Sequence, residues 1–235
     1  MNNNEFNADA ASLSVDLSEA RQAVKENRFQ DALDLFEIIL ETDPDHIDSL
    51  YLISVASRYL KKFDESRKYI ERLLFIAPDM GRAYQELGHI HRDMGNLAKA
   101  AIHYRQACEL NPALLASWNS LYKYFVESKN KPAADHAREQ IEKLQSLPPA
   151  LLYIDQIMNE GRLGIAETQC RAFLKKNPTH TYAMSLLSEI ANRLGYFDDA
   201  EFLLEKAVEF EPKDGELRMK YAQILRKKQK FAKTM

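Results

Sequence analysis

The residue types that most often carry chemistry are present, but their spacing is not that of a metal site. The chain has 6 histidines and 2 cysteines. His89 and His91 are two residues apart, which puts them on opposite sides of a helix, and neither His-x3-His nor Cys-x2-Cys occurs. His91 is better interpreted as a packed histidine. We therefore expect no bound metal and no cofactor.

Motifs that bind phosphate or activate a nucleophile are missing from the sequence. Neither G-x4-G-K-[ST] nor G-x-G-x-x-G occurs, and there is no G-x-S-x-G turn that could expose a serine. We therefore predict no catalytic residue and expect the chain not to be an enzyme.

Composition narrows the class of protein and of partner. The 235 residues are 46% hydrophobic and 29% charged, which is typical of a folded, water-soluble protein. A formal net charge of −3 gives no reason to expect binding to nucleic acid or to an acidic membrane.

The N-terminus carries no targeting signal, because MNNNEFNADAAS has neither a basic start nor an apolar run. No window approaches the roughly 18 apolar residues of a membrane helix. We expect a cytoplasmic protein in which Cys108 and Cys170 are buried, reduced thiols.

These residues are arranged in a repeat. Pro44, Pro78 and Pro112 follow one another at intervals of 34 residues, as do Pro178 and Pro212. The interval from Pro112 to Pro178 is two residues short of two periods, so a junction near residues 144–149 is shortened. A small residue recurs in the same frame, at Ala32, Ser66, Ala100, Ala134, Ala166 and Ala200. So does a turn position, at Asn27, Lys61, Gly95, Lys129, Gly161 and Gly195.

Each period predicts two helices that end at these turns and prolines. The predicted helices are Ser12–Asn27, Phe29–Glu41, Ile47–Leu60, Phe63–Ile76, two within Gly81–Pro112, one opening at Leu115, Pro132–Gln145, Leu151–Glu160, Leu163–Lys176, Thr181–Leu194, Phe197–Phe210 and Glu216–Lys228. Phe231 is expected to open a further helix.

The stretch from Gly81 to Pro112 resembles one tetratricopeptide repeat (TPR), a helix–turn–helix unit of 34 residues. The residues that carry the resemblance are Tyr84, Leu87, Gly88, His91, Gly95, Ala100, Tyr104, Ala107 and Pro112. Gly88 and Ala100 are small where two helices approach closely, and Gly95 supplies a left-handed turn. The resemblance implies an all-α fold, a right-handed α-solenoid of antiparallel helix pairs (a TPR superhelix) with about six and a half repeats.

The expected organisation is a disordered tail over residues 1–11 and a single TPR array over 12–235. The repeats are expected at 13–46, 47–80, 81–114, 115–146, 147–180 and 181–214, with a partial repeat at 215–235. The last helix keeps apolar residues that a following helix would cover. We therefore expect either a cut end, with self-association through this uncapped helix, or a natural end in which the helix is the cap.

In TPR arrays the first helix of each pair lines a concave groove, and the resemblance assigns particular repeat positions to it. Those positions form a cationic, partly aromatic strip along repeats two to four. The predicted groove residues are Tyr51, Arg58, Tyr59, Gln85, His89, Arg92, Asn119 and Lys123.

Such a strip suits an acidic peptide or a chain-terminal carboxylate, so a non-catalytic protein–protein interaction scaffold is the expected function. The alternative is a solvated groove in which nearby carboxylates, Asp48, Asp93 and Glu127, balance the cations.

The second half of the chain resembles a narrower group, the N-terminal arrays of bacterial TPR-containing sulfotransferases. The residues behind this are Gly161-Arg-Leu, Ala166-Glu167, Pro178, Leu187, Ile190-Ala191, Arg193-Leu194-Gly195, Ala200-Glu201, Leu204, Pro212, Arg218, Tyr221-Ala222 and Leu225-Arg226. In that family more repeats follow, then a catalytic domain that uses the sulfuryl donor PAPS. No residue here matches the phosphosulfate-binding loop, so the resemblance implies no catalytic residue in this chain.

Overall fold

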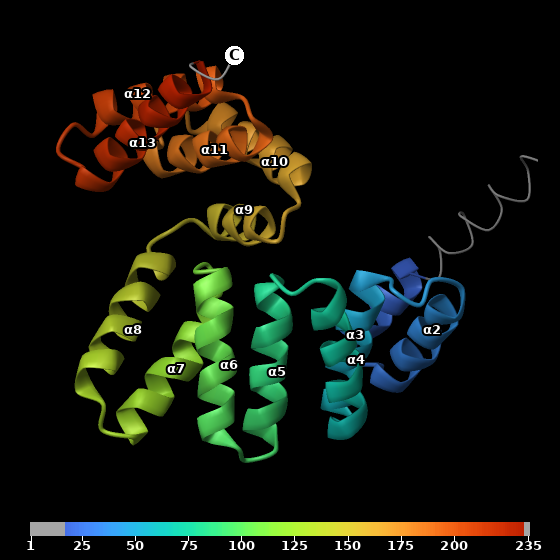
Figure 1. Cartoon of the computed structure of the whole chain (residues 1–235). Helices are drawn as coiled ribbons and strands as arrows, with labels where there is room; N and C mark the ends of the chain where they lie inside the picture. The colour runs from blue at the N-terminus through green and yellow to red at the C-terminus, as the bar shows by residue number, and fades with distance from the viewer. Residues whose placement is uncertain (1–16, 233–235) are drawn as a thin grey trace, which may run out of the picture. The chain divides into compact units, whose positions relative to one another are not determined.

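The computed structural model describes residues 17–232, and within that range the chain forms only helices and the turns between them (Figure 1). The all-α prediction is confirmed, with antiparallel helix pairs following one another along the chain. The tail predicted over residues 1–11, and the predicted start of the first helix at Ser12, lie outside the described residues. The described part of that first helix covers residues 17–25.

The helices follow the predicted frame closely. Their bounds are α2 Phe29–Thr42, α3 Ile47–Tyr59, α4 Phe63–Ile76, α5 Gly81–Asp93, α6 Leu97–Leu110, α7 Leu115–Glu127, α8 Lys131–Gln145, α9 Pro149–Asn159, α10 Leu163–Lys176, α11 Thr181–Leu194, α12 Phe197–Phe210 and α13 Gly215–Ala232. Four of them, α4, α10, α11 and α12, have the predicted bounds at both ends.

All six predicted turn positions have a left-handed backbone. The φ angles are 59° at Asn27, 60° at Lys61, 81° at Gly95, 57° at Lys129, 77° at Gly161 and 85° at Gly195. At Gly95 the turn closes with two backbone bonds, from Gly95 N to Arg92 O at 2.9 Å and from Asn96 N to His91 O at 2.8 Å. These bonds use carbonyls that the helix end leaves without partners, which is why α5 stops there.

Close helix contact explains the small residues. A Cβ atom on Gly88 would lie 2.6 Å from the ring of Tyr104, so only glycine lets α5 and α6 approach as they do. Ala100 is 2% exposed at the same helix pair. In the second repeat the small residue is Ser66, whose Oγ donates to the carbonyl oxygen of Ser54 at 2.7 Å.

The chain divides into two compact units, residues 1–141 (unit 1) and 142–235 (unit 2), with the division inside α8. Apolar clusters run through unit 1, with Phe36, Ile53 and Leu73 fully buried among the repeats. Unit 2 has its own core, in which Leu151 and Ile190 are fully buried. The single array over residues 12–235 therefore stays a prediction.

The two largest differences from the predicted bounds in unit 2 are at the start of α9 and the end of α13. Helix α9 begins at Pro149, two residues before the predicted Leu151, because proline fits the first helical position, where an N–H would be unsatisfied. The prediction that Phe231 opens a new helix is wrong, because α13 runs unbroken through it to Ala232. The next turn position in the repeat frame is Gln229, and glutamine has a high helix propensity.

The last helix, α13, packs its apolar face inward. Leu217 is 5% and Ile224 is 6% exposed, both in a cluster with α12, whereas Met219 is 62% exposed. Self-association through this helix stays a prediction.

None of the described helices combines the length and the apolar character needed to cross a bilayer.

Candidate binding site

The predicted groove residues lie on the first helices of three successive repeats of unit 1. Tyr51, Arg58 and Tyr59 are on α3, Gln85, His89 and Arg92 on α5, and Asn119 and Lys123 on α7. Tyr59, Arg92, Asn119 and Lys123 are exposed, whereas Tyr51, Gln85 and His89 are partly buried. Arg58 alone among the eight is buried, with 8% of its surface exposed.

The burial of Arg58 follows from its two carboxylate partners. Its Nε donates to Oε1 of Glu86 at 2.5 Å, and its Nη1 donates to Oδ2 of Asp93 at 3.0 Å. Burial alone lowers the pKa of the guanidinium, but the charge and hydrogen bond of Glu86 outweigh it and raise that pKa above its ordinary value. Arg58 therefore joins the second and third repeats as an internal ion pair, with few donors left for a ligand.

His89 and Arg92 extend this polar network towards Tyr104 on α6. His89 Nδ1 lies 2.7 Å from the Tyr104 hydroxyl, and Arg92 donates twice to Oδ1 of Asp93, at 2.9 and 2.8 Å. Burial, together with the charges of Arg58 and Arg92, lowers the pKa of His89 to about 4. His89 is therefore neutral at pH 7, and it holds Tyr104 rather than supplying a positive charge.

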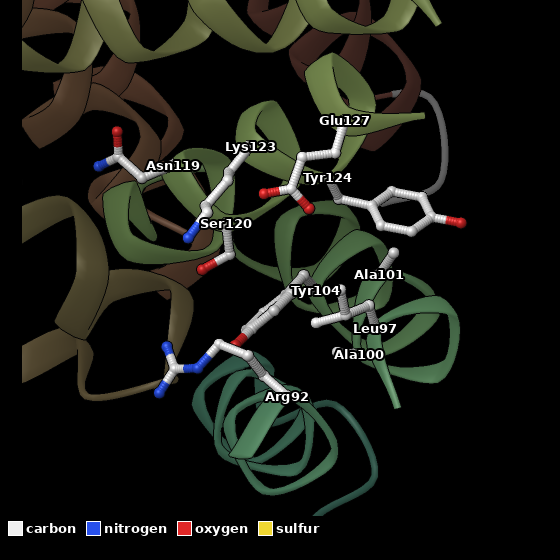
Figure 2. Close-up of a pocket in the computed structure, with 10 residues that line it drawn as sticks. All are labelled: Arg92, Leu97, Ala100, Ala101, Tyr104, Asn119, Ser120, Lys123, Tyr124 and Glu127. Atoms are coloured by element: carbon white, nitrogen blue, oxygen red, sulfur yellow. The ribbon is translucent and has the colours of Figure 1, made fainter. Parts of the chain in front are cut away.

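The network ends at a pocket of about 490 Å³ between α5, α6 and α7. The lining side chains are Arg92, Leu97, Ala100, Ala101, Tyr104, Asn119, Ser120, Lys123, Tyr124 and Glu127 (Figure 2). Three of the predicted groove residues, Arg92, Asn119 and Lys123, thus come together in one cavity. The remaining five do not line it.

The two cationic side chains of the pocket differ in whether they already have an ion-pair partner. Arg92 is paired with Asp93, whereas Lys123 forms no ion pair with any residue in the described range 17–232. Figure 2 shows the ammonium of Lys123 and the guanidinium of Arg92 on one side of the pocket and the ring of Tyr124 on the other. In the same view the carboxylate of Glu127 lies between the side chains of Lys123 and Tyr124. The cavity can therefore offer a free ammonium to an anion.

Seven of the ten lining residues were not among the predicted groove residues, four of them because the prediction considered only the first helices. Leu97, Ala101 and Tyr104 come from α6, the second helix of the third repeat. Tyr104 belongs to the repeat pattern, which explains its packing against Gly88 but not its place in the lining of a cavity. Of the carboxylates expected to balance the strip, Asp93 pairs with Arg58 and Arg92.

Unit 2 has a smaller pocket, of about 200 Å³, between α11, α12 and α13. Its two lysines already have partners, because Lys220 donates to Ser185 Oγ at 3.1 Å and Lys227 to Asn192 Oδ1 at 2.8 Å. Of these two pockets, the one between α5, α6 and α7 is therefore the stronger candidate for binding an anion.

His91 and both cysteines, which lie outside these pockets, are packed. The ring of His91 stacks on His103, with 5.1 Å between centroids, and His91 is buried as the sequence predicts. Cys108 and Cys170 are buried and free, and burial raises the pKa of each thiol to about 12. In the described part of the chain, no three His, Cys, Asp or Glu side chains are grouped as metal ligands.

Comparison with known proteins agrees with this architecture. A tetratricopeptide repeat family model matches residues 81–114 and 182–214, and a second tetratricopeptide repeat model matches residues 17–81. Together the two models cover more than half of the chain, with the helix pairs and left-handed turns that the repeat requires. The chain belongs to the tetratricopeptide repeat family, whose members generally mediate protein–protein interactions.

Solved structures share the fold at low sequence identity. PilF from Pseudomonas aeruginosa is 14% identical, with a TM-score of 0.52, over 93% of this chain and 98% of that one. A tetratricopeptide repeat protein from Parabacteroides merdae is 11% identical, with a TM-score of 0.51, over 92% and 99%. MamA from Desulfovibrio magneticus is 19% identical, with a TM-score of 0.50, over 57% and 75%. This chain is similar to them in fold.

Proposed function

We propose that this protein is a non-catalytic interaction scaffold that binds an acidic peptide segment of a partner protein in the concave groove of unit 1. The observation that carries the proposal is Lys123, an exposed ammonium without an ion pair in the described range, at the edge of a 490 Å³ pocket. A carboxylate on this ammonium gains a charge-assisted hydrogen bond without breaking an internal one.

The other groove residues have graded roles in this proposal. Arg92 adds a second positive charge that Asp93 partly neutralises, and Asn119 offers a neutral amide from the same pocket wall. Tyr51, Tyr59 and Gln85 continue the surface towards the second repeat as neutral contacts. Arg58 and His89 act indirectly, because they hold Asp93 and Tyr104 in place.

The direct test is charge reversal at Lys123. Peptides selected from a random library on the wild-type protein are measured for affinity to Lys123→Glu, by fluorescence anisotropy. Lys68→Glu on α4 is the matched control, since Lys68 is also an exposed lysine without an ion pair in the described part of unit 1. We expect about tenfold or greater loss for Lys123→Glu, no loss for Lys68→Glu, and weaker binding as salt rises. Equal affinity of the two variants would refute the proposal.

The cytoplasm is the proposed location, on the basis of the sequence expectation. A cell-fractionation experiment with an antibody to the protein tests it, and recovery in a membrane or extracellular fraction would contradict it.

A second candidate is that this chain forms the TPR portion of a PAPS-dependent sulfotransferase. It is supported by the residue pattern of the second half, from Gly161-Arg-Leu to Leu225-Arg226. The test is the reading frame after Met235. Further repeats followed by a phosphate-binding loop would support the enzyme, and an immediate stop codon would leave the scaffold.

A further inference from the structure

The charged side of the unit 1 pocket is only half of its lining. The other half is apolar or aromatic: Leu97 is 45% exposed at the lip, Ala100 and Ala101 form part of the wall, and Tyr104 and Tyr124 contribute rings. Figure 2 shows Leu97, Ala100 and Ala101 grouped together from α6, away from the ammonium of Lys123. A peptide made only of Asp and Glu residues has no apolar side chain for this half of the pocket, which would stay in contact with water.

The volume fits more than a single carboxylate. At about 490 Å³ the pocket lies within the range of about 300–1,000 Å³ that is typical of sites for small ligands. Such sites combine an apolar lining with a few polar groups that fix the orientation of the ligand. Here Lys123, Ser120 and Arg92 are those polar groups.

We infer that the pocket is a specificity pocket for one large apolar side chain of the bound peptide, with an acidic residue beside it in the sequence. The inference rests on the proposed function, because it names the kind of peptide that the same groove selects. The apolar side chain lies against Leu97, Ala101 and Tyr124, and the neighbouring carboxylate accepts from Lys123. Aromatic residues bury the most apolar area per side chain and are favoured.

Glu127 limits how much acidity the peptide can have. It lies one helical turn after Lys123 and forms no ion pair within the described range 17–232. A carboxylate on the Lys123 side is attracted, whereas a second one beside Glu127 is repelled and gains nothing in return. The preferred peptide therefore has an acidic residue on one side of its apolar residue and a neutral or basic residue on the other.

Selection from a random twelve-residue peptide display library tests both the apolar and the acidic preference. The baits are wild type, Lys123→Glu, Ala101→Leu, which fills the pocket from its wall, and Leu97→Ser, which removes the apolar lip. Leu97 is at the surface, so this variant keeps the test valid if Ala101→Leu unfolds. Selected peptides are then resynthesised with the apolar residue changed to alanine, and their affinities are measured.

The expected result is enrichment of an aromatic or large aliphatic residue next to Asp or Glu. The apolar preference should be lost with Leu97→Ser or Ala101→Leu, and the acidic preference with Lys123→Glu. Changing the apolar residue to alanine should weaken binding about tenfold or more.

Enrichment of acidic residues without an apolar position would overturn this inference and leave the proposed function standing. If the protein selects the same peptides as a surface without protein, or selects basic peptides, both this inference and the proposed function are overturned.

Discussion

Nε of Arg58 on α3 donates to Oε1 of Glu86 on α5 over 2.5 Å, and both side chains are buried. The pair joins the second repeat to the third, and Asp93 adds a second acceptor at 3.0 Å. A cation that the sequence alone would assign to ligand binding thus belongs to the interior. Among the predicted groove residues, the cation without an ion pair in the described range lies further along, at Lys123.

Removing one partner of this pair should destabilise unit 1 strongly. Arg58→Ala leaves Glu86 as a buried carboxylate without its cation, so we expect a loss of about 3 kcal/mol or more in the free energy of unfolding. Arg67→Ala, which breaks exposed pairs with Asp64 and Glu71, should cost less than about 1 kcal/mol. Urea unfolding followed by circular dichroism measures both. Equal losses in the free energy of unfolding for the two variants would show that the buried ion pair stabilises the fold no more than the exposed pairs do.

Acidification should destabilise unit 1 through His89. Its pKa is about 4 in the folded protein and about 6.5 in an unfolded chain, so between these values the unfolded state binds more protons. Stability is therefore full above pH 6.5 and falls as the pH drops towards 4, by about 2 kcal/mol at pH 5.

His89→Gln removes this titration, so its stability should depend less on pH than that of wild type between pH 7 and pH 5. Thermal unfolding at a series of pH values tests this. Parallel curves for the two proteins would exclude His89 as the cause. His91 and His103, whose pKa values are also lowered by burial, should account for the pH dependence that remains.

Two glycine-to-alanine changes should shift the free energy of unfolding in opposite directions. Gly88→Ala places a Cβ 2.6 Å from the ring of Tyr104 and should cost about 1–3 kcal/mol, because α5 and α6 must move apart. Gly164→Ala in α10 meets no atom within 4 Å and should stabilise by about 0.4–1 kcal/mol, since alanine has less freedom when unfolded. Melting temperatures of the two variants decide, and a stabilised Gly88→Ala would contradict the close contact.

The two thiols should be unreactive in the folded protein. Burial raises the pKa of Cys108 and of Cys170 to about 12, so almost no thiolate is present at pH 8. With a thiol-specific chromogenic reagent we expect slow reaction of the native chain and rapid reaction of both thiols in denaturant. Fast labelling under native conditions would mean that at least one thiol is accessible.

The helices and turns were predicted well from the sequence because each feature of the pattern recurs in several repeats. Left-handed turns were predicted even where lysine stands, at Lys61 and Lys129, since the frame rather than the residue type marks the position. The end of the last helix was mispredicted at Phe231, because the frame gives no information where a residue such as Gln229 favours continuing the helix.

The candidate site was predictable only in part. The frame identified the helix face on which Arg92, Asn119 and Lys123 lie, and these three line the pocket. It could not identify the partner of Arg58, because Glu86 is 28 residues away and their contact depends on how two repeats pack. Nor could it identify Tyr104 as part of the pocket wall, since the pocket depends on the space left between α6 and α7.

The affinity of Lys123→Glu for a library-selected acidic peptide, compared with that of Lys68→Glu, decides whether unit 1 binds peptides at Lys123. Both variants change the net charge equally, so only the position of the charge differs. We expect a loss of about tenfold or more for Lys123→Glu and wild-type affinity for Lys68→Glu. Equal affinities in the two variants, whether retained or lost together, would contradict a peptide site at this pocket.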